Sequence, residues 1–552
     1  MKAEACASNP SMKEMNSKEL YNELITVSKP GRYLGNEWNS YHKEWETTPV
    51  HIALCYPETY EIGMSNLGLK ILYELLNSRT DTLADRVYAP SVDFEECLRR
   101  NKWPLFGLET RRPLIDFDAI GFTLQHELTY TNVLNVLDLG GIPVFSSQRE
   151  SGYPLIIGGG PCALNPEPIA EFFDAIFVGE VEDKLASVVE CIKQNGRNKQ
   201  KLLTELTEIP GVYVPLVRGQ EKPRPVQRQY VDIKSWPCPV RPPVANVDTV
   251  HARFDLEIAR GCPHSCKFCQ ASRLYHPYRF RSPEQLTGYI ASGIKNTGYD
   301  EVALLSLSTT DYPELPSLVK RIRENLAGKH VSISLPSSRP DRFSPEIAKC
   351  AAQTRRGGLT FAPEAGTERL RAIIGKPLSD AVLDEAVGLA VAYGWRTVKL
   401  YFMYGLPGEL HSDLQGIINT IKGLKKNHHG LNINMSLSPF IPKPHTPFER
   451  EKWAGVQELE EARRFLKKYL SANVRSRRVD MAELEAVLAR SDKKLSGVIY
   501  NAWKFGAKFD GWREQFRADL WTQAFMETNV DKDVYLRSIP PDERLAWEHI
   551  EV

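Results

Sequence analysis

The sequence predicts an α/β protein with three parts: a doubly wound parallel sheet, a partial barrel of six parallel strands, and a helical C-terminal region. Two series of short apolar strands alternate with helical stretches, at about 50–217 and 251–450. Such alternation is typical of parallel sheets covered by helices. Proline-rich text separates the series, and no clear strand follows residue 450. We therefore expect an N-terminal extension at 1–49, a first sheet at 50–217, a linker at 218–250, a barrel at 251–450 and a helical region at 451–552.

The composition is that of a folded, water-soluble protein. Of 552 residues, 42% are hydrophobic and 25% are charged, and the formal net charge is +1. That charge gives no global field to recruit nucleic acid or an anionic membrane. No apolar run reaches the roughly 18–20 residues that span a bilayer. The polar N-terminus lacks the apolar core of a secretory signal. We expect a cytoplasmic protein without a membrane span.

The first series contains four clear strand patterns with helices between them. The strands are HIALCYP from His51, DAIGFTLQ, YPLIIGGGP and DAIFVGE. Helical periods lie in SNLGLKILYELLN, at 129–139 and near 181–193. The text that follows, including WPCPVRPPV, sustains neither period and predicts a connecting segment.

The second series supplies six strand–helix units. Its strands are DLEIA, EVALLSLS, HVSISLP, GLTFAP, TVKLYFMYG and NINMSLSPF. Six such units over roughly 200 residues predict a barrel or partial barrel, in which the carboxyl ends of the strands carry the chemistry. Beyond them, QELEEARRFLKKYL and LSGVIYNAWKFG predict helices.

Three cysteines cluster in ARGCPHSCKFCQAS, directly after the first barrel strand. Cys262, Cys266 and Cys269 have the spacing C-x3-C-x2-C, whereas the other seven of the ten cysteines are scattered singly. Scattered thiols in a large cytosolic chain are usually reduced and packed, so a disulfide framework is unexpected. Two metal hypotheses stay open from the spacing.

One hypothesis is zinc, which would need a fourth ligand. A histidine could supply it: His264, His251 or His276. The other is a 4Fe–4S cluster, in which three protein thiolates leave one iron open to a small molecule.

The pattern C-x3-C-x-aromatic-C at the end of a first barrel strand resembles the signature of the radical S-adenosylmethionine (SAM) superfamily, and Phe268 occupies its aromatic position. The resemblance implies that the three cysteines bind a 4Fe–4S cluster and that the open iron chelates SAM. An electron from the cluster would then split SAM into methionine and a 5′-deoxyadenosyl radical. It also implies a one-electron reductant such as flavodoxin or ferredoxin.

Three further barrel segments resemble SAM-binding parts of the superfamily. YFMYGLPGE, with Gly405 and Gly408, is similar to the fifth-strand segment along which adenine lies, although these glycines also permit a turn. TFAPEAGTERLR is similar to the fourth-strand segment, which makes Glu364 a candidate SAM contact. The alternative for Glu364 is a carboxylate favoured at a helix N-terminus. In SLSTTD, Ser308 and Thr309 are candidates for binding the SAM amino group.

A doubly wound sheet before such a barrel resembles the cobalamin-binding class. That class carries a D-x-H-x-x-G motif after its first strand, and its histidine binds cobalt. Here the segment is ETYEIG, with Gly63 in place and Tyr60 where the histidine would stand. The resemblance therefore implies cobalamin without this ligand. His126 is a candidate substitute, with a capping or cleft residue as the alternative.

Two later signals of the cobalamin-binding class are present. GFTL, which includes Thr123, stands where a hydroxyl-x-Leu motif meets the nucleotide tail, and Gly158, Gly159 and Gly160 form a glycine-rich edge. Glycines let a backbone approach a ligand closely. The alternative is that this sheet persists without cobalamin.

Taken end to end, the chain resembles radical SAM proteins with an N-terminal cobalamin-type domain. The first function hypothesis is cobalamin-linked alkylation, most simply methylation, of an unactivated carbon on an unknown substrate. The second is RNA modification with the first sheet as scaffold, where Arg355, Arg356 and the run Arg463–Arg478 would meet phosphates; the alternative for that run is a solvated helix face. The third is a non-catalytic cluster-bearing assembly or sensing protein.

Overall fold

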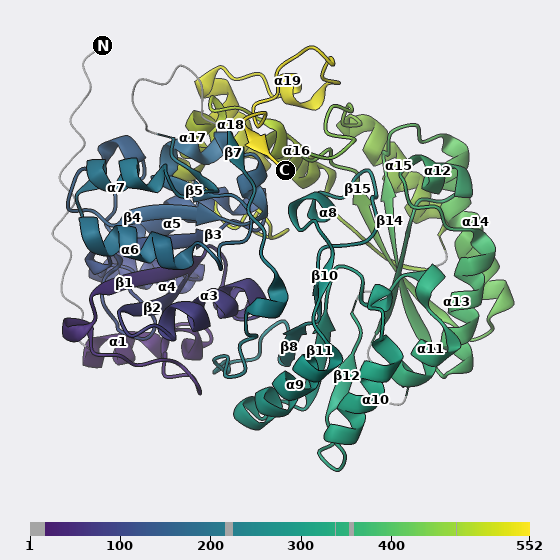
Figure 1. The fold of residues 1–552 in the computed structure, drawn as a ribbon. Coiled ribbons are helices and arrows are strands. Elements are labelled where there is room, and N and C mark those ends of the chain that lie inside the picture. Colours follow the sequence, from purple (N-terminus) through teal and green to yellow (C-terminus); the bar gives the residue numbers. More distant parts are fainter. Residues whose placement is uncertain (1–16, 216–224, 337, 353–357, 471) are drawn as a thin grey trace.

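The computed structural model describes residues 17–215, 225–336, 338–352, 358–470 and 472–552. Figure 1 shows the N-terminal sheet, in purple to blue, beside the barrel strands, in teal to green. The C-terminal helices, in yellow-green to yellow, lie along the top of both. The predicted α/β fold with two sheet systems and a helical C-terminal region is confirmed. The boundaries of the five expected segments stay predictions.

The N-terminal sheet has the order β2-β1-β3-β4-β5-β6. The strands are β1 (Val50–Tyr56), β2 (Thr82–Tyr88), β3 (Ala119–Thr123), β4 (Leu155–Gly159), β5 (Ala175–Phe177) and β6 (Val212–Tyr213). The first five run parallel, and β6 is antiparallel to β5. Strand order therefore reverses beside β1, which is the place where open α/β sheets bind ligands.

Helices cover both faces of this sheet. Helices α3 (Leu67–Asn77), α6 (Leu185–Asn195) and α7 (Lys199–Leu206) pack on one face, and α4 (Val92–Asn101) and α5 (Tyr130–Leu139) pack on the other. Alternate residues of each strand supply the two cores: Ile52 and Leu54 join the first, whereas Ala53 and Cys55 join the second. Short helices α1 (Ser17–Leu24) and α2 (Tyr60–Gly63) complete this part.

All six predicted barrel strands are present. They are β8 (Phe254–Glu257), β11 (Glu301–Leu305), β12 (Ser332–Ser334), β13 (Leu359–Glu364), β14 (Thr397–Tyr404) and β15 (Asn432–Pro439). They form two hydrogen-bonded sheets, β12-β11-β8 and β13-β14-β15, the second of which is extended by β16 (Asn473–Ser476). The helices between them are α8 (Ala271–Leu274), α9 (Pro283–Thr297), α10 (Leu315–Asn325), α11 (Pro345–Ala352), α12 (Glu368–Ile373), α13 (Asp380–Ala392) and α14 (His411–Asn427).

The expectation of no strand after residue 450 is wrong. Strand β16 (Asn473–Ser476) extends the barrel sheet in parallel beside β15. Its sequence, NVRS, has a single apolar residue, so it lacks the hydrophobic alternation that predicts a strand. The two-residue strands β7 (Val226–Gln227) and β17 (Ile550–Glu551) also pair in parallel, which joins the linker to the C-terminal region.

The C-terminal helices are α15 (Val456–Tyr469), α16 (Val479–Arg490), α17 (Leu495–Lys504), α18 (Ala518–Thr528) and α19 (Asp533–Leu536).

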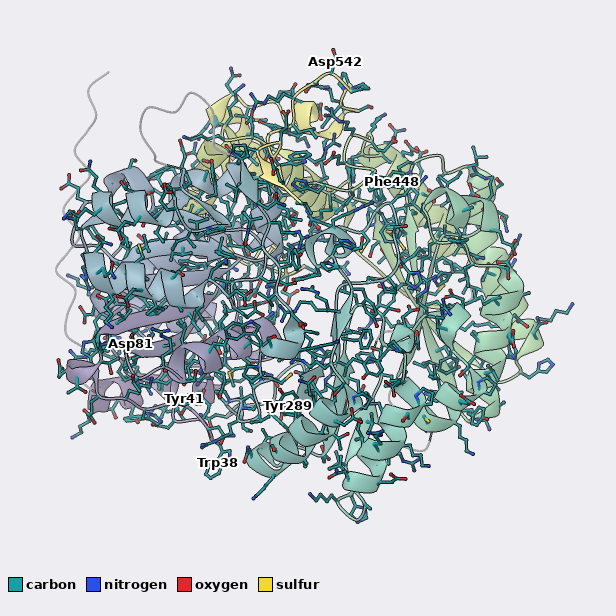
Figure 2. The ribbon with its side chains drawn as sticks, in the orientation of Figure 1. Trp38, Tyr41, Asp81, Tyr289, Phe448 and Asp542 are labelled. Atoms are coloured by element: carbon teal, nitrogen blue, oxygen red, sulfur yellow. The ribbon has the colours of Figure 1, made fainter. Side chains whose placement is uncertain are left out.

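At the opposite side of the molecule, the N-terminal extension reaches the barrel. The indole of Trp38, labelled in Figure 2, donates to the carbonyl of Asn296 in α9 at 2.8 Å. Among the described helices, none is long and apolar enough to cross a membrane.

Candidate functional site

The cysteine loop leaves the barrel on a short hairpin made by β9 (Ala259–Arg260) and β10 (Arg279–Phe280). Gly261 follows β9 with φ +84, in the left-handed region. A Cβ there would lie 2.5 Å from the Tyr275 carbonyl oxygen and 2.6 Å from that of Pro277. Only glycine fits this close approach, so the turn that begins the loop requires it.

The three cysteines of the loop carry free thiols. Cys266 is buried, and Cys262 and Cys269 are partly exposed. The backbone N–H of Cys269 donates to the Cys266 carbonyl at 3.1 Å, and that of Lys267 donates to Ile374 at 2.9 Å, which holds the loop against α12. Burial raises the pKa of the Cys266 thiol, whereas the nearby Lys376 ammonium favours the thiolate that a metal needs.

The cysteine trio is not arranged around a single ion. Four ligands on one zinc lie within about 4 Å of each other, because each bond is only about 2.0–2.3 Å long. Within the described ranges, His126, Glu127 and Glu485 are the one group of three or more candidate ligand atoms that approach within 4.8 Å of each other. The nearby His264 is also engaged, with its Nε2 2.7 Å from Asp311 Oδ2. The three thiols form no such group, so they do not converge as the ligands of one zinc ion do.

Phe268 of the cysteine loop packs against a small buried apolar cluster. The cluster includes Leu406, Phe440 and Phe448, the last labelled in Figure 2, and Met403 of β14 packs against it as well. The aromatic position of the motif therefore shares an apolar cluster with Leu406 of the GLPGE segment.

The GLPGE turn contains two glycines in the left-handed region, Gly405 and Gly408, both with φ +74. A Cβ at Gly405 would lie 2.5 Å from Leu459, whereas Gly408 has no neighbour closer than Ile373 at 3.7 Å. The Gly405 N–H donates to Glu409 Oε2 at 2.7 Å. Burial raises the pKa of Glu409 to about 8.

Glu364 ends β13 in an unusual conformation. Its φ is +70, and the register of β13 against β14 shifts just before it. Its carboxylate accepts from Lys376 Nζ at 3.0 Å, and both groups lie close enough to Cys266 to influence its ionisation. A non-glycine residue held in this region stores strain and often marks a functional site. Glu364 thus lies beside the cysteine loop, as a SAM contact would require.

The two candidates in SLSTTD already have partners. Ser308 donates to Asp311 Oδ2 at 2.6 Å, and the fully buried Thr309 donates to the Leu304 carbonyl at 3.1 Å. Asp311 also accepts from His264 of the cysteine loop, so a hydrogen bond joins the SLSTTD segment to this loop. Their assignment to the SAM amino group stays a prediction.

A cavity of about 460 Å³ lies between the N-terminal sheet and the barrel. One part of its lining is apolar and lies between the sheet and helices α3 and α6, at Leu72 and Val188. Residues at the ends of β8, β9 and β11 line another part. This part includes Arg260 and Gly261, the residues directly before Cys262. The cavity therefore reaches the base of the cysteine loop.

The predicted glycine-rich edge forms one wall of the cavity, through Thr123, Gly158, Gly159 and Gly160. A Cβ on Gly160, at φ +120, would lie 2.7 Å from the Leu124 carbonyl, and one on Gly158 would lie 2.8 Å from the Leu124 side chain. A Cβ on Gly159 would meet nothing closer than the Phe177 carbonyl at 3.8 Å. Gly159 leaves a space that a side chain would fill, which fits a large ligand against the sheet.

Tyr60 and Gly63 lie outside the cavity lining. Tyr60 is fully buried; its hydroxyl donates to Glu37 at 2.9 Å and accepts from the Asn246 N–H at 3.1 Å. A Cβ on Gly63 would lie 2.3 Å from the Tyr88 ring. The expectation that ETYEIG faces the ligand is therefore not supported, because α2 turns this segment into the interior.

The cavity is reached instead by the next residues along the chain, Asn66, Leu67 and Gly68 at the start of α3. Asn66 caps this helix by accepting from the Leu69 N–H at 2.8 Å. An Asn directly before a helical period is a recognisable signal for a helix start, so the start of α3 could have been located from the sequence.

His126 takes the alternative role, as a helix cap. Its Nδ1 accepts from the Leu128 N–H at 3.1 Å, and its Nε2 lies 3.2 Å from Glu485 Oε2. It does not line the cavity. Lys443 Nζ lies 2.7 Å from Glu127 and 2.8 Å from Glu485, so an ammonium already fills the position that a metal ion would take among these groups.

Sequence reasoning missed the charged part of the cavity lining, which consists of Glu180, Glu182, Glu257 and Arg260. Arg260 is 2.7 Å from Glu182 and 2.8 Å from Glu257. No motif marks this group, because the contact between Glu182 and Arg260 joins positions far apart in the sequence.

Three arginines of the run suggested for phosphate contacts are paired. Arg463, Arg477 and Arg478 form ion pairs with Glu460, Glu485 and Asp480. Arg355 and Arg356 lie outside the described residues. The paired arginines are those of a structural surface, which gives the RNA hypothesis no support.

Family comparisons agree with this geometry. Residues 256–421 match the model of the radical SAM superfamily, and residues 68–215 match the model described as radical SAM proteins, N-terminal. The chain belongs to the radical SAM superfamily. It is accordingly a radical SAM enzyme, a class that uses a 4Fe–4S cluster, SAM, a reductant and a substrate.

Among curated relatives, the chain is 30% identical to the uncharacterized protein MJ0966 of Methanocaldococcus jannaschii over 450 residues, which cover 81% of this chain and 90% of that protein. It is 25% identical to the ribosomal protein uS12 methylthiotransferase RimO of Syntrophobacter fumaroxidans over 236 residues, which cover 41% of this chain and 50% of RimO.

Two solved structures share the fold. The radical SAM methyltransferase TsrM of Kitasatospora setae, with cobalamin and a [4Fe-4S] cluster bound, has a TM-score of 0.54 at 15% identity, covering 72% of this chain and 77% of TsrM. The cobalamin-dependent radical SAM enzyme OxsB, with aqua-cobalamin bound, has a TM-score of 0.53 at 14% identity, covering 88% of this chain and 72% of OxsB. At these identities the likeness shows the fold alone.

Proposed function

We propose that this protein is a cobalamin-dependent radical SAM enzyme that alkylates, most simply methylates, an unactivated carbon of its substrate. The observation that carries the proposal is the cavity of about 460 Å³, which joins the glycine edge of the N-terminal sheet to the base of the cysteine loop. A corrinoid held there would face the centre at which SAM is cleaved.

Four groups of residues would hold the cofactors. Cys262, Cys266 and Cys269 would bind the cluster, and Glu364 with the GLPGE turn would position SAM. The glycine edge and the start of α3 would hold the corrinoid. When bound, these groups supply reductive cleavage of SAM and a transferable methyl group.

The chain's own part is to orient and to exclude water. Phe268 of the cysteine loop packs on an apolar cluster that includes Leu406 and Phe440. The Lys376–Glu364 pair places a fixed carboxylate beside the loop. Neither Tyr60 nor His126 lines the cavity, so neither side chain would hold a corrinoid bound there. The likeness to TsrM and OxsB, whose structures contain cobalamin, supports the proposal.

The first test is reductive SAM cleavage. Anaerobically reconstituted wild-type protein should bind about four irons and release 5′-deoxyadenosine from SAM under dithionite. The variant with Cys262, Cys266 and Cys269 all changed to Ala should lose both properties. Glu364→Gln should keep its iron but bind SAM more weakly. Absence of 5′-deoxyadenosine from wild-type protein with an intact cluster would overturn the catalytic proposal.

A further inference from the structure

A set of buried ion pairs joins the N-terminal sheet to the residue that precedes the cysteine loop. Glu180 and Glu182 follow β5, and their side chains are 3% and 7% exposed. Arg260 of β9 lies 3.0 Å from Glu180 and 2.7 Å from Glu182 through the same Nη1 atom. Its Nε lies 2.8 Å from Glu257 in β8. One guanidinium thus contacts both sheet systems.

The second strand of the hairpin is held by the same carboxylates. Arg279 of β10 lies 2.8 Å from Glu180, and it also donates to the Val231 carbonyl at 2.6 Å. Because β9 and β10 pair with each other, both strands that carry the cysteine loop are anchored to one carboxylate pair of the N-terminal sheet.

This network of ion pairs lies beside both parts of the proposed site, the cysteine loop and the cavity. Arg260 is separated from Cys262 by Gly261 alone, whose packing allows no side chain. Glu180, Glu182 and Arg260 all line the cavity. A ligand that displaces water there lowers the local dielectric constant and strengthens these pairs. Losing one partner instead leaves an uncompensated charge, which is costly when buried.

We propose that Arg260 is a positioning residue for the cysteine loop, and that Glu182 and Glu180 transmit occupancy of the cavity to it. Arginine suits this role because its planar guanidinium fixes the directions of several hydrogen bonds at once. The identity of the cavity ligand as a corrinoid rests on the proposed function. The positioning of the loop by Arg260 does not.

The test is Glu182→Gln, which removes one charge at nearly constant shape and breaks an ion pair with Arg260. The matched control is Glu95→Gln. The Glu95 side chain is 5% exposed, and it joins α4 of the N-terminal part to the C-terminal region through Lys508 at 2.8 Å. Both variants and wild type would be reconstituted with iron anaerobically, without corrinoid. Paramagnetic resonance of the reduced, SAM-bound cluster and the rate of iron release to a chelator would be measured.

We expect equal iron content in all three proteins. Glu182→Gln should have an altered resonance line shape and several-fold faster iron release, whereas Glu95→Gln should match wild type in both. Glu182→Asp, which keeps the charge, should restore the wild-type line shape. If Glu182→Gln fails to fold, Arg260→Lys serves in its place, since it keeps the charge and loses the planar fork. A Glu182→Gln protein indistinguishable from wild type, or equal changes in both Glu→Gln variants, would overturn the positioning role.

A second arm adds hydroxocobalamin. It should slow iron release from wild type and have no such effect in Glu182→Gln. Hydroxocobalamin that binds wild type and leaves iron release unchanged would overturn the transmission of occupancy. If wild type binds no hydroxocobalamin, the proposed function fails, while the measurements made without corrinoid still decide the role of Arg260.

Discussion

Two adjacent glycines of β4, Gly158 and Gly159, face opposite sides of the sheet. Gly158 faces packed side chains, and Gly159 faces the cavity. A Cβ on Gly158 would meet Leu124 at 2.8 Å and Phe173 at 3.1 Å, whereas one on Gly159 would enter the cavity. The sequence grouped both into one glycine edge. Only the register of β4 in the sheet assigns them different physical roles.

Gly159→Leu should fill the cavity wall and reduce hydroxocobalamin binding at least tenfold, or about 1.4 kcal/mol. Its unfolding free energy should change by less than about 1 kcal/mol, because the new side chain enters open space. Equilibrium dialysis and urea unfolding measure the two quantities. The control, Gly158→Ala, should instead lose about 1–3 kcal/mol of stability by overpacking. Full corrinoid binding by Gly159→Leu would contradict the placement of the ligand.

Local motifs were predictable at this scale, and contacts across the chain were not. The cysteine trio and Phe268 are recognisable from short spacings, and their role in holding a cluster stays a prediction. The roles of Glu182 and Arg260 depend on a contact between residues far apart in sequence. Aligning Tyr60 with the motif histidine takes no account of the turn of α2, which carries Tyr60 into a buried hydrogen bond with Glu37.

At the scale of elements, the turn after β14 is held by a half-buried carboxyl group. Glu409 accepts from the Gly405 N–H, and burial raises the pKa of Glu409 from 4.5 to about 8. Between these values the folded chain keeps a proton that the unfolded chain has released. Stability from this group is therefore complete below about pH 4.5 and is lost as the pH rises through about 8.

The difference in unfolding free energy between wild type and Glu409→Gln should become less favourable to wild type as the pH rises from 5 to about 8. Urea unfolding across this range measures it. Glutamine keeps an oxygen that accepts from Gly405 and cannot titrate. The exposed Glu514→Gln serves as control and should show no such trend. A pH-independent difference for Glu409→Gln would show that Glu409 is ionised in the folded protein throughout.

Element prediction succeeded where a hydrophobic period was present. All six barrel strands have buried alternate or continuous apolar residues that contact the helices. Strand β16 was missed because Val474 is its one apolar residue and its pairing comes from the exposed edge of β15. A strand recruited by an existing edge needs backbone hydrogen bonds more than it needs a hydrophobic face.

At the scale of the whole molecule, one lysine joins all three parts. Lys443 follows β15 of the barrel and contacts Glu127 of the N-terminal part and Glu485 of α16. Burial opposes its charge, but the two carboxylates raise the pKa of Lys443, so it stays charged. Further buried hydrogen bonds, such as Thr131 to Asp510 at 2.7 Å, fasten the C-terminal region to the N-terminal part.

Lys443→Met should lower the unfolding free energy by about 3–5 kcal/mol, because two buried carboxylates lose a shared cation. Urea unfolding measures this change. Adding Glu127→Gln and Glu485→Gln to the same chain should recover part of the loss, since the uncompensated charges are then removed. A Lys443→Met protein as stable as wild type would show that the junction is solvated and contributes little.

The overall α/β architecture was predictable because two alternating series and a proline-rich linker are local features. The way in which the sheet and barrel enclose a shared cavity was not predictable from one sequence, since it depends on how the separate parts dock. The central claim, a corrinoid beside a SAM-cleaving cluster, depends on that docking.

The most direct test is to quantify iron and corrinoid in protein reconstituted anaerobically with both, and to record paramagnetic resonance of the Co(II) form. We predict about four irons and one corrinoid per chain, with no nitrogen hyperfine splitting from a protein ligand. An intact cluster with no corrinoid bound at any tested concentration would contradict the account. Nitrogen splitting that disappears in His126→Ala would contradict the assignment of His126 as a helix cap.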